Sequence, residues 1–151
     1  MKYLHSMIRT SNLDKTLDFY VNKLGLIEVK RYDNDLGKFT LVFLCASDDY
    51  KNAKNFKSPL IEITYNWPNH KGDIEELDTG RSFGHLAFRV SNIYETCEKL
   101  MKNNITINRP PKDGHMAFIK SPDNISIELL QEGEPLKPKE PWASMKNIGT
   151  W

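Results

Sequence analysis

An internal repeat constrains the fold of this chain more than any other feature of its sequence. The segments "LHSMIRTSNLDKTLDFY" and "GHLAFRVSNIYETCEKL" contain the same parts in the same order: a histidine, alternating apolar residues, a Ser-Asn pair and an amphipathic helical pattern. His5 aligns with His85, and Arg9 with Arg89, without a gap. Two half-size modules of one construction are therefore expected.

Each Ser-Asn pair precedes a stripe of apolar residues at the i, i+4 and i+7 positions of a core-facing helix. The two stripes are Leu13, Leu17 and Tyr20 in the first copy, and Ile93, Cys97 and Leu100 in the second. Serine and asparagine are favoured N-caps. Ser11 or Asn12, and the equivalent residue of the second copy, is therefore expected to cap each helix.

Three strand-like runs, rich in β-branched and aromatic residues, follow each predicted helix. They read "LGLIEVKRYDN", "GKFTLVFLCAS" and "SPLIEITYNW" in the first copy, and "ITINRPP", "GHMAFIKS" and "ISIELLQE" in the second. The turn expected before the last run is marked by Pro122, Asp123 and Asn124. The polar segments 47–58 and 68–81 are expected to be surface loops.

These patterns predict an α+β fold of tandem βαβββ modules within residues 1–132. Module one covers 1–67, a linker loop 68–82, and module two 83–132. Residues 133–151 form a tail with three prolines and two tryptophans. Trp142 and Trp151 indicate that the tail docks on an apolar surface, but the pattern does not say which.

Charge and cysteine content exclude several classes of function. The chain has 151 residues and a formal charge of +1, which provides no broad positive field for nucleic acid or an anionic membrane. No apolar run is long enough to cross a bilayer, and the start lacks the apolar core of a signal peptide. A cytoplasmic location is expected. Cys45 and Cys97 lack metal-binding spacing and are expected to be buried and reduced.

Glu62 and Glu128 each stand in an apolar frame in the last strand of their module. A carboxylate in such a frame is costly to bury unless it is paired or binds a cation. If the first and fourth strands of a module are parallel neighbours, His5 faces Glu62 and His85 faces Glu128. Two imidazoles and two carboxylates suit zinc, nickel, cobalt or iron and leave positions open for substrate.

Arg9 and Asn66 share the strand faces of His5 and Glu62, four residues beyond each. A guanidinium and an amide placed together suit a carboxylate. The pattern therefore predicts a groove for an elongated anion whose reactive centre lies at the metal. His70 and His115 have no counterpart in the repeat; we expect His70 in a surface loop and His115 at a strand end or cleft rim.

The segments "LHSMIRTSNLDKTLDFYVNKLGL", "IEITYNW", "FGHLAFRV" and "SPDNISIELL" resemble the glyoxalase I (lactoylglutathione lyase) family of the vicinal oxygen chelate superfamily. The resemblance covers residues 3–131, although the last turn reads "SPDN" where "DPDG" is common. It implies curved mixed sheets that form a metal-containing cleft. The metal ligands would be His5, Glu62, His85 and Glu128, and the γ-glutamyl carboxylate of glutathione would be held by Arg9 and Asn66, with Arg81 as an added contact.

The same resemblance implies a homodimer with interfacial sites, each using His5 and Glu62 of one chain and His85 and Glu128 of the other. The metal would be nickel or cobalt first and zinc second. The implied reaction isomerises the hemithioacetal of methylglyoxal and glutathione to S-lactoylglutathione through a metal-stabilised enediolate. Glu128 would be the base, with Glu62 orienting solvent or handling protons on the opposite face.

Three other functions remain open at this stage. A ring-cleaving dioxygenase uses two histidines and one carboxylate on iron, so two in-register glutamates count against it. An epimerase acting on an acyl-coenzyme A would need more positive charge near its cleft. A metal-free ligand-sequestering resistance protein needs no ligand set. Met116, Phe118 and Leu130 either line the cleft or belong to the core.

Overall fold

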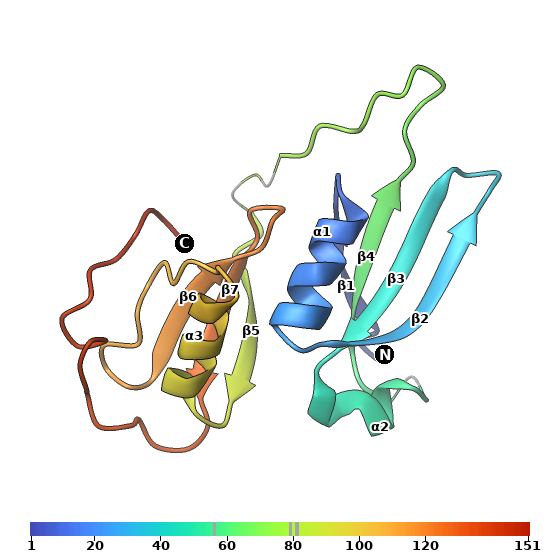
Figure 1. The fold of residues 1–151 in the computed structure, drawn as a ribbon. Coiled ribbons are helices and arrows are strands. Elements are labelled where there is room, and N and C mark those ends of the chain that lie inside the picture. Colours follow the sequence, from blue (N-terminus) through green and yellow to red (C-terminus); the bar gives the residue numbers. More distant parts are fainter. Residues whose placement is uncertain (56, 79, 81) are drawn as a thin grey trace. The chain divides into compact units, whose positions relative to one another are not determined.

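The computed structural model describes residues 1–55, 57–78, 80 and 82–151. The chain divides into two compact units, Met1–Asp78 and Thr79–Trp151, and each contains one sheet with a mixture of parallel and antiparallel strands. The course of the chain through each unit is drawn in Figure 1. This α+β architecture agrees with the fold class predicted from the sequence.

The first unit is built on a four-stranded sheet in the order β1-β4-β3-β2. Its elements are β1 (His5–Arg9), α1 (Leu13–Leu17), the π-helical η1 (Asp18–Lys23), β2 (Ile27–Asn34), β3 (Phe39–Cys45), the 3₁₀-helical η2 (Ser47–Asp49), α2 (Tyr50–Ala53) and β4 (Leu60–Asn66). Strands β1 and β4 pair in parallel, and the other pairs are antiparallel. The first and last strands of the unit are therefore direct neighbours, as the sequence predicted.

The core of the first unit lies between η1 and one face of its sheet. Phe19 and Tyr20 are fully buried, with their rings edge to face at 5.0 Å. Val42 and Ile63 are also fully buried. Because side chains alternate along a strand, Phe43 and Glu62, the next residues, belong to the opposite face. That second face carries the polar residues of the repeat.

The second unit repeats this plan with a three-stranded sheet in the order β5-β7-β6. Its elements are β5 (His85–Val90), α3 (Ile93–Lys102), β6 (Met116–Lys120) and β7 (Ser126–Gln131). Strands β5 and β7 are parallel, and β6 and β7 are antiparallel. Ile127 and Leu129 are fully buried, which leaves Ser126, Glu128 and Leu130 on the other face of β7.

Both predicted helices begin at the asparagine of the Ser-Asn pair. The Asn12 side chain accepts a hydrogen bond from the backbone N–H of Lys15, and that of Asn92 accepts from Tyr94 and Glu95. The predicted stripe of the second helix is buried throughout, because Ile93, Cys97 and Leu100 are each at most 1% exposed. In the first helix Tyr20 is buried, while its two leucines are half-buried.

The two cysteines are free and buried. Burial raises the pKa of Cys97 to about 12 and also raises that of Cys45. Both thiols therefore stay protonated at neutral pH. The prediction of buried, reduced cysteines is confirmed.

Two predictions about local structure are wrong. Residues 105–111 do not form a strand; only an isolated bridge joins Arg109 to Phe118. Pro110 and Pro111 lack backbone N–H groups, so this segment has too few donors to continue a ladder. The segment 47–58, predicted to be a loop, contains the short helices η2 and α2, with Ala53 buried against β-strand residues.

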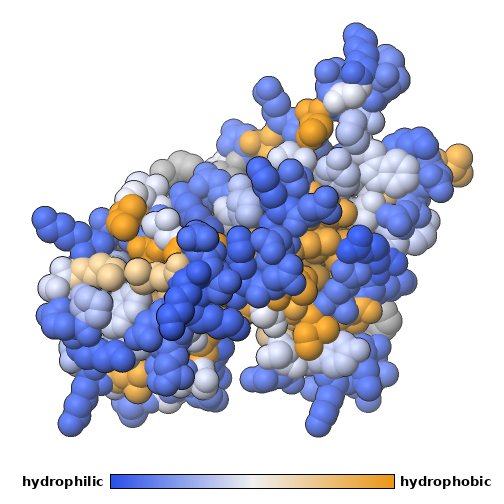
Figure 2. Space-filling model, in the orientation of Figure 1, coloured by the Kyte–Doolittle hydropathy of each residue, from blue (hydrophilic) through white to orange (hydrophobic). Residues whose placement is uncertain are grey.

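The other polar segment contains no helix or strand in its described part, residues 68–78 and 80. It extends beyond the end of β4, and hydrophilic residues cover most of it (Figures 1 and 2). The turn at Pro122–Asn124 also forms as predicted, with Asn124 in a left-handed conformation at φ 62°. Of the helices in the described part of the chain, none is long and apolar enough to span a bilayer.

The tail docks on its own unit. The N–H of Leu136 donates to the carbonyl of Gly114 at 3.0 Å, and a side chain at position 114 would clash with the Leu136 carbonyl. Farther along, the Trp142 indole is 1% exposed and stacks on Tyr94 of α3, with ring centroids 6.2 Å apart. The Tyr94 hydroxyl donates to the Lys137 carbonyl at 3.1 Å. The tail therefore completes the core beside α3.

Replacing Trp142 with alanine should lower the free energy of unfolding by about 3 to 5 kcal/mol, since it leaves a large cavity against Tyr94. Urea denaturation followed by circular dichroism measures this loss. Trp151→Ala is the matched control, because Trp151 is 40% exposed and should cost less than about 1 kcal/mol. Equal losses in the two variants would contradict the docking of the tail through Trp142.

Candidate functional site

The parallel pairing of β1 and β4 brings His5 to Glu62. Met7 is the register partner of Glu62, and His5 lies two positions earlier on the same strand face. The distance from His5 Nε2 to Glu62 Oε2 is 3.0 Å. The imidazole is 39% exposed and the glutamate side chain 13%, so the pair stands at the surface with its carboxylate mostly covered.

The second unit carries an equivalent pair. Ala87 is the register partner of Glu128, and His85 again lies two positions earlier. The distance from His85 Nε2 to Glu128 Oε2 is 3.2 Å, with side-chain exposures of 43% and 14%. The repeat seen in the sequence is thus repeated in the geometry of its polar residues.

A phenylalanine completes each pair. Phe43 on β3 is the register partner of Glu62, and Phe118 on β6 is that of Glu128. Each ring meets its histidine edge to face, at centroid distances of 5.9 Å for His5 and 5.6 Å for His85. Phe118, which the sequence assigned either to the cleft or to the core, is buried at 8% exposure, and its ring contacts His85. The sequence analysis did not identify Phe43. The feature that could have indicated it is its position in the strand opposite Glu62, a glutamate flanked by apolar residues.

The side chains of the two pairs, one histidine and one glutamate from each unit, are of the types that bind a divalent cation. In the two pairs the imidazole nitrogen and the carboxylate oxygen lie 3.0 and 3.2 Å apart, the distance of a direct hydrogen bond or ion pair. Imidazole nitrogen and carboxylate oxygen are both ordinary ligands of zinc and nickel. Within the described residues no three or more of the side chains of His, Cys, Asp and Glu form a group able to hold a metal. Each unit therefore holds one histidine–glutamate pair.

The two glutamates differ in their restraints. The Thr64 hydroxyl donates to Glu62 Oε1 at 3.2 Å. The corresponding position in the second unit is Leu130, which has no hydroxyl, and within the described part of the chain the recorded polar contact of Glu128 is His85 alone. Glu128 is consequently the freer of the two carboxylates.

Arg9 and Asn66, at the far end of the same strand face, both contact the carboxylate of Glu75. Asn66 Nδ2 donates to Glu75 Oε2 at 2.6 Å, and Arg9 Nε lies 3.9 Å from Glu75 Oε1. Glu75 comes from the 68–78 segment, and no sequence pattern had singled it out. Arg81, the third predicted contact, lies outside the described residues.

The segment before β6 is held by the carboxylate of Asp113, which contacts Arg109, His115 and Met116. Burial alone would raise the pKa of Asp113, but hydrogen bonds from Arg109 and from the N–H groups of His115 and Met116 outweigh it and hold this pKa at about 2. The ionised carboxylate therefore fixes the start of the strand that carries Phe118. His115 is half-buried at this strand end, and His70 is exposed in a turn, as predicted.

The fold and its matched histidine–glutamate pairs define a duplicated α+β protein with one such pair in each unit. The chain belongs to the Glyoxalase/Bleomycin resistance protein/Dioxygenase superfamily, whose sequence profile matches residues 2–129. It is 37% identical to the lactoylglutathione lyase of Neisseria meningitidis over 137 residues, which cover 87% of this chain and 91% of that one. It is 33% identical to the enzyme of the same name from Escherichia coli O157:H7, covering 87% and 93%.

Solved structures agree with this placement. A trypanothione-dependent glyoxalase I from Leishmania major superposes with a TM-score of 0.75 at 32% identity, over 87% of both chains. The sequence prediction of a glyoxalase-type fold is therefore confirmed.

Proposed function

We propose that this protein is a lactoylglutathione lyase, which isomerises the hemithioacetal of methylglyoxal and glutathione to S-lactoylglutathione and so detoxifies methylglyoxal. The observation that carries the proposal is the matched His5–Glu62 and His85–Glu128 pairs. They occur in a chain similar over most of its length to enzymes of that name. A ligand-sequestering protein would need no such donors.

The family implies a divalent metal, and His5, Glu62, His85 and Glu128 are the residues that would hold it. We place nickel or cobalt first and zinc second. When bound, the cation supplies Lewis-acid stabilisation of the negative charge that develops on the substrate oxygens. No redox chemistry is required, so nickel, cobalt and zinc could each supply this Lewis-acid stabilisation.

The protein's own contribution to the chemistry is a proton transfer. Glu128 removes the proton from the carbon that bears sulfur, and a proton is returned to the neighbouring carbon. We assign this role to Glu128 because Thr64 restrains Glu62, whereas Glu128 has no equivalent hydroxyl donor in the described residues. Glu62 orients solvent or handles protons on the opposite face.

Arg9 and Asn66 bind the γ-glutamyl carboxylate of glutathione, with Arg81 as the additional cation. The position of Glu75 supports this, because a carboxylate already fits between the guanidinium and the amide. Charge-assisted hydrogen bonds to a carboxylate are among the stronger polar contacts in proteins. Holding this end of the substrate would orient the reactive end towards the metal ligands.

Two copies of the chain form the working protein in this proposal, with His5 and Glu62 of one chain and His85 and Glu128 of its partner at each site. The division of the donors between two units supports such an exchange. We also place the protein in the cytoplasm, because its substrate forms from a reduced thiol and both of its own cysteines are free.

The function is tested by removing the metal, adding nickel, cobalt or zinc separately, and following formation of the thioester from methylglyoxal and glutathione by its ultraviolet absorbance. Reloaded wild type should be active. Glu128→Gln should keep the fold and most of the metal, yet lose at least about a hundredfold in turnover, because a general base is lost.

Glu132→Gln is the control, since Glu132 is exposed just beyond β7 and should retain wild-type turnover. Activity of Glu128→Gln near that of wild type would show that the base is misassigned. A wild-type chain that binds none of the three metals and forms no thioester would rule out the proposed function.

The exchange of units between chains is tested by co-expressing His5→Ala with His85→Ala. Each variant alone should be inactive. Random pairing makes half of the dimers mixed, and one site of each mixed dimer is intact, so the mixture should recover about a quarter of wild-type activity. The control pair is His5→Ala with Glu62→Ala, which should recover none because both changes affect the same unit. No recovery in the first mixture would contradict sites shared between chains.

Glu75 should compete with the substrate carboxylate for Arg9 and Asn66. Glu75→Gln removes this negative charge and should lower KM for the hemithioacetal by about two- to fivefold, the scale of a partly exposed ion pair. Steady-state kinetics give the answer, with Glu76→Gln as the neighbouring control that should leave KM unchanged. A higher KM in Glu75→Gln would instead mean that Glu75 assists binding.

A further inference from the structure

Methylglyoxal, the aldehyde of the proposed reaction, is an electrophile with two adjacent carbonyl carbons, and an arginine side chain carries two terminal nitrogens on one planar group. One nitrogen adds to the aldehyde carbon and the other to the ketone carbon, which closes a five-membered ring. Loss of one water and one proton then leaves a neutral imidazolone. The step needs no oxidant or reductant, so any accessible arginine with free terminal nitrogens is a chemical target.

Two arginines of this chain have their guanidinium groups held by carboxylates. Arg31 donates to both carboxylate oxygens of Glu28, from Nε at 3.0 Å and from Nη2 at 2.8 Å. These hydrogen bonds raise the pKa of Arg31. Arg109 donates from Nη2 to Asp113 at 2.9 Å and from Nη1 to the Met116 carbonyl. Because the ring forms through the small deprotonated fraction of a guanidinium, a carboxylate that stabilises the cation slows the reaction.

Arg89, near the end of β5, has no such restraint. It is exposed, and among the residues that the structure describes no carboxylate lies within 4 Å of its guanidinium, Glu132 included. Its counterpart in the repeat, Arg9, differs, since Arg9 Nε lies 3.9 Å from the carboxylate of Glu75. The duplicated position is therefore paired in one unit and unpaired in the other.

The strands beside Arg89 present apolar side chains. Leu130 is the register partner of Arg89, and Met116 is the register partner of Leu130. Both are half-buried. In the first unit the partner of Arg9 is Thr64, which carries a hydroxyl. Loss of the positive charge at Arg89 therefore breaks no ion pair, and the neutral ring that replaces it would lie beside apolar neighbours.

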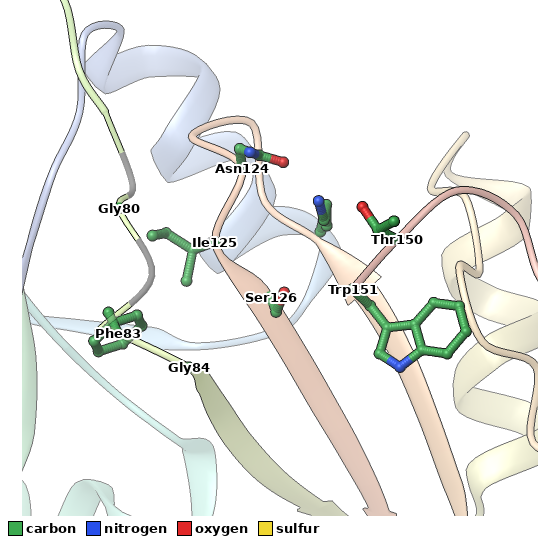
Figure 3. Close-up of a pocket in the computed structure, with 9 residues that line it drawn as sticks. Gly80, Phe83, Gly84, Asn124, Ile125, Ser126, Thr150 and Trp151 are labelled. Atoms are coloured by element: carbon green, nitrogen blue, oxygen red, sulfur yellow. The ribbon is translucent and has the colours of Figure 1, made fainter.

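Arg89 is separate from the pocket at the opposite end of its strand. That pocket is lined by residues that include Ser126 and Trp151 (Figure 3), and the Trp151 ring lies 6.2 Å from that of Phe118. Arg89 is not among the lining residues and stands four positions beyond His85, or about 13 Å along a strand at about 3.3 Å per residue. A molecule in this pocket therefore leaves the Arg89 guanidinium open to solution.

We propose that Arg89 is a site of covalent modification by free methylglyoxal, which closes an imidazolone ring across its two terminal nitrogens. The inference rests on the proposed function for its reagent, because the hemithioacetal forms reversibly and leaves some aldehyde uncombined. Cys45 and Cys97 do not compete, since both thiols are buried. The adduct accumulates when methylglyoxal exceeds glutathione, and it removes a positive charge from the strand that begins at His85.

Peptide mapping of the full-length metal-loaded protein tests this selectivity. The protein is incubated with methylglyoxal at neutral pH, cleaved at acidic residues and examined by mass spectrometry over time. The adduct should form at Arg89 about tenfold faster than at Arg31 or Arg109, the scale of one charge-assisted contact. Arg89→Gln should lose this adduct and leave the rates at the other two unchanged. Reaction at Arg89 no faster than at Arg31 would overturn the proposal.

Glu28→Gln is the matched test of the physical cause. It removes the carboxylate from Arg31, so the rate at Arg31 should rise towards that at Arg89, while the rate at Arg109 stays as in wild type. An unchanged rate at Arg31 would show that carboxylate pairing does not set the selectivity, and the proposal would fail with it. Thermal unfolding of each variant checks that the fold is retained.

Glutathione separates this inference from the proposed function. An excess of the thiol should suppress the Arg89 adduct, and an adduct that forms equally fast with and without it would contradict reaction with the free aldehyde. If the protein forms no thioester yet reacts fastest at Arg89, the proposed function fails and the modification site stands. If thioester forms but Arg89 reacts no faster than Arg31, the inference alone is overturned.

Discussion

The parallel pairing of the first and last strands in each unit is the constraint on which the candidate site depends. These strands are far apart in sequence, yet the register of β1 on β4 and of β5 on β7 sets a histidine beside a glutamate at 3.0 and 3.2 Å. A one-residue slip would turn every side chain of a strand to the opposite face. Because the other face is the buried core, such a slip would place the glutamate among apolar residues, so core formation and site formation select the same register.

The sequence predicted those parts of the structure that follow from periodicity and local chemistry. The asparagine caps, the apolar stripe of α3 and the turn at Pro122–Asn124 all depend on residues close together in the chain. The pairing of the first and last strands in each unit was predicted from the repeat, because both halves of the chain show the same pattern. The prediction of a strand at 105–111 failed because β-branched residues favour extended backbone, while Pro110 and Pro111 remove the donors that a ladder requires.

Glu75 and Phe43 were missed for another reason. Both matter through a partner distant in sequence: Arg9 for Glu75 and His5 for Phe43. An acidic residue in a polar segment has no pattern that distinguishes it from its neighbours, and a phenylalanine in a strand is an ordinary core residue. The two units also diverge where the repeat suggests identity, since Thr64 restrains one glutamate and Leu130 stands in the equivalent place. The two equivalent glutamates of the duplicated fold therefore differ in how many hydrogen bonds restrain them.

The close approach at Gly114 has a consequence for how this chain tolerates change. Only a residue without Cβ leaves room there for the Leu136 carbonyl, and the backbone at this glycine has a φ of +69° that other residues adopt at a cost. Everything beyond residue 136, including the tryptophan packed on α3 and the one beside Phe118, follows a route that begins at this crossing. A side chain added at residue 114 would therefore displace the tail where it crosses the second unit, and with it the indole that closes the apolar interior beside α3.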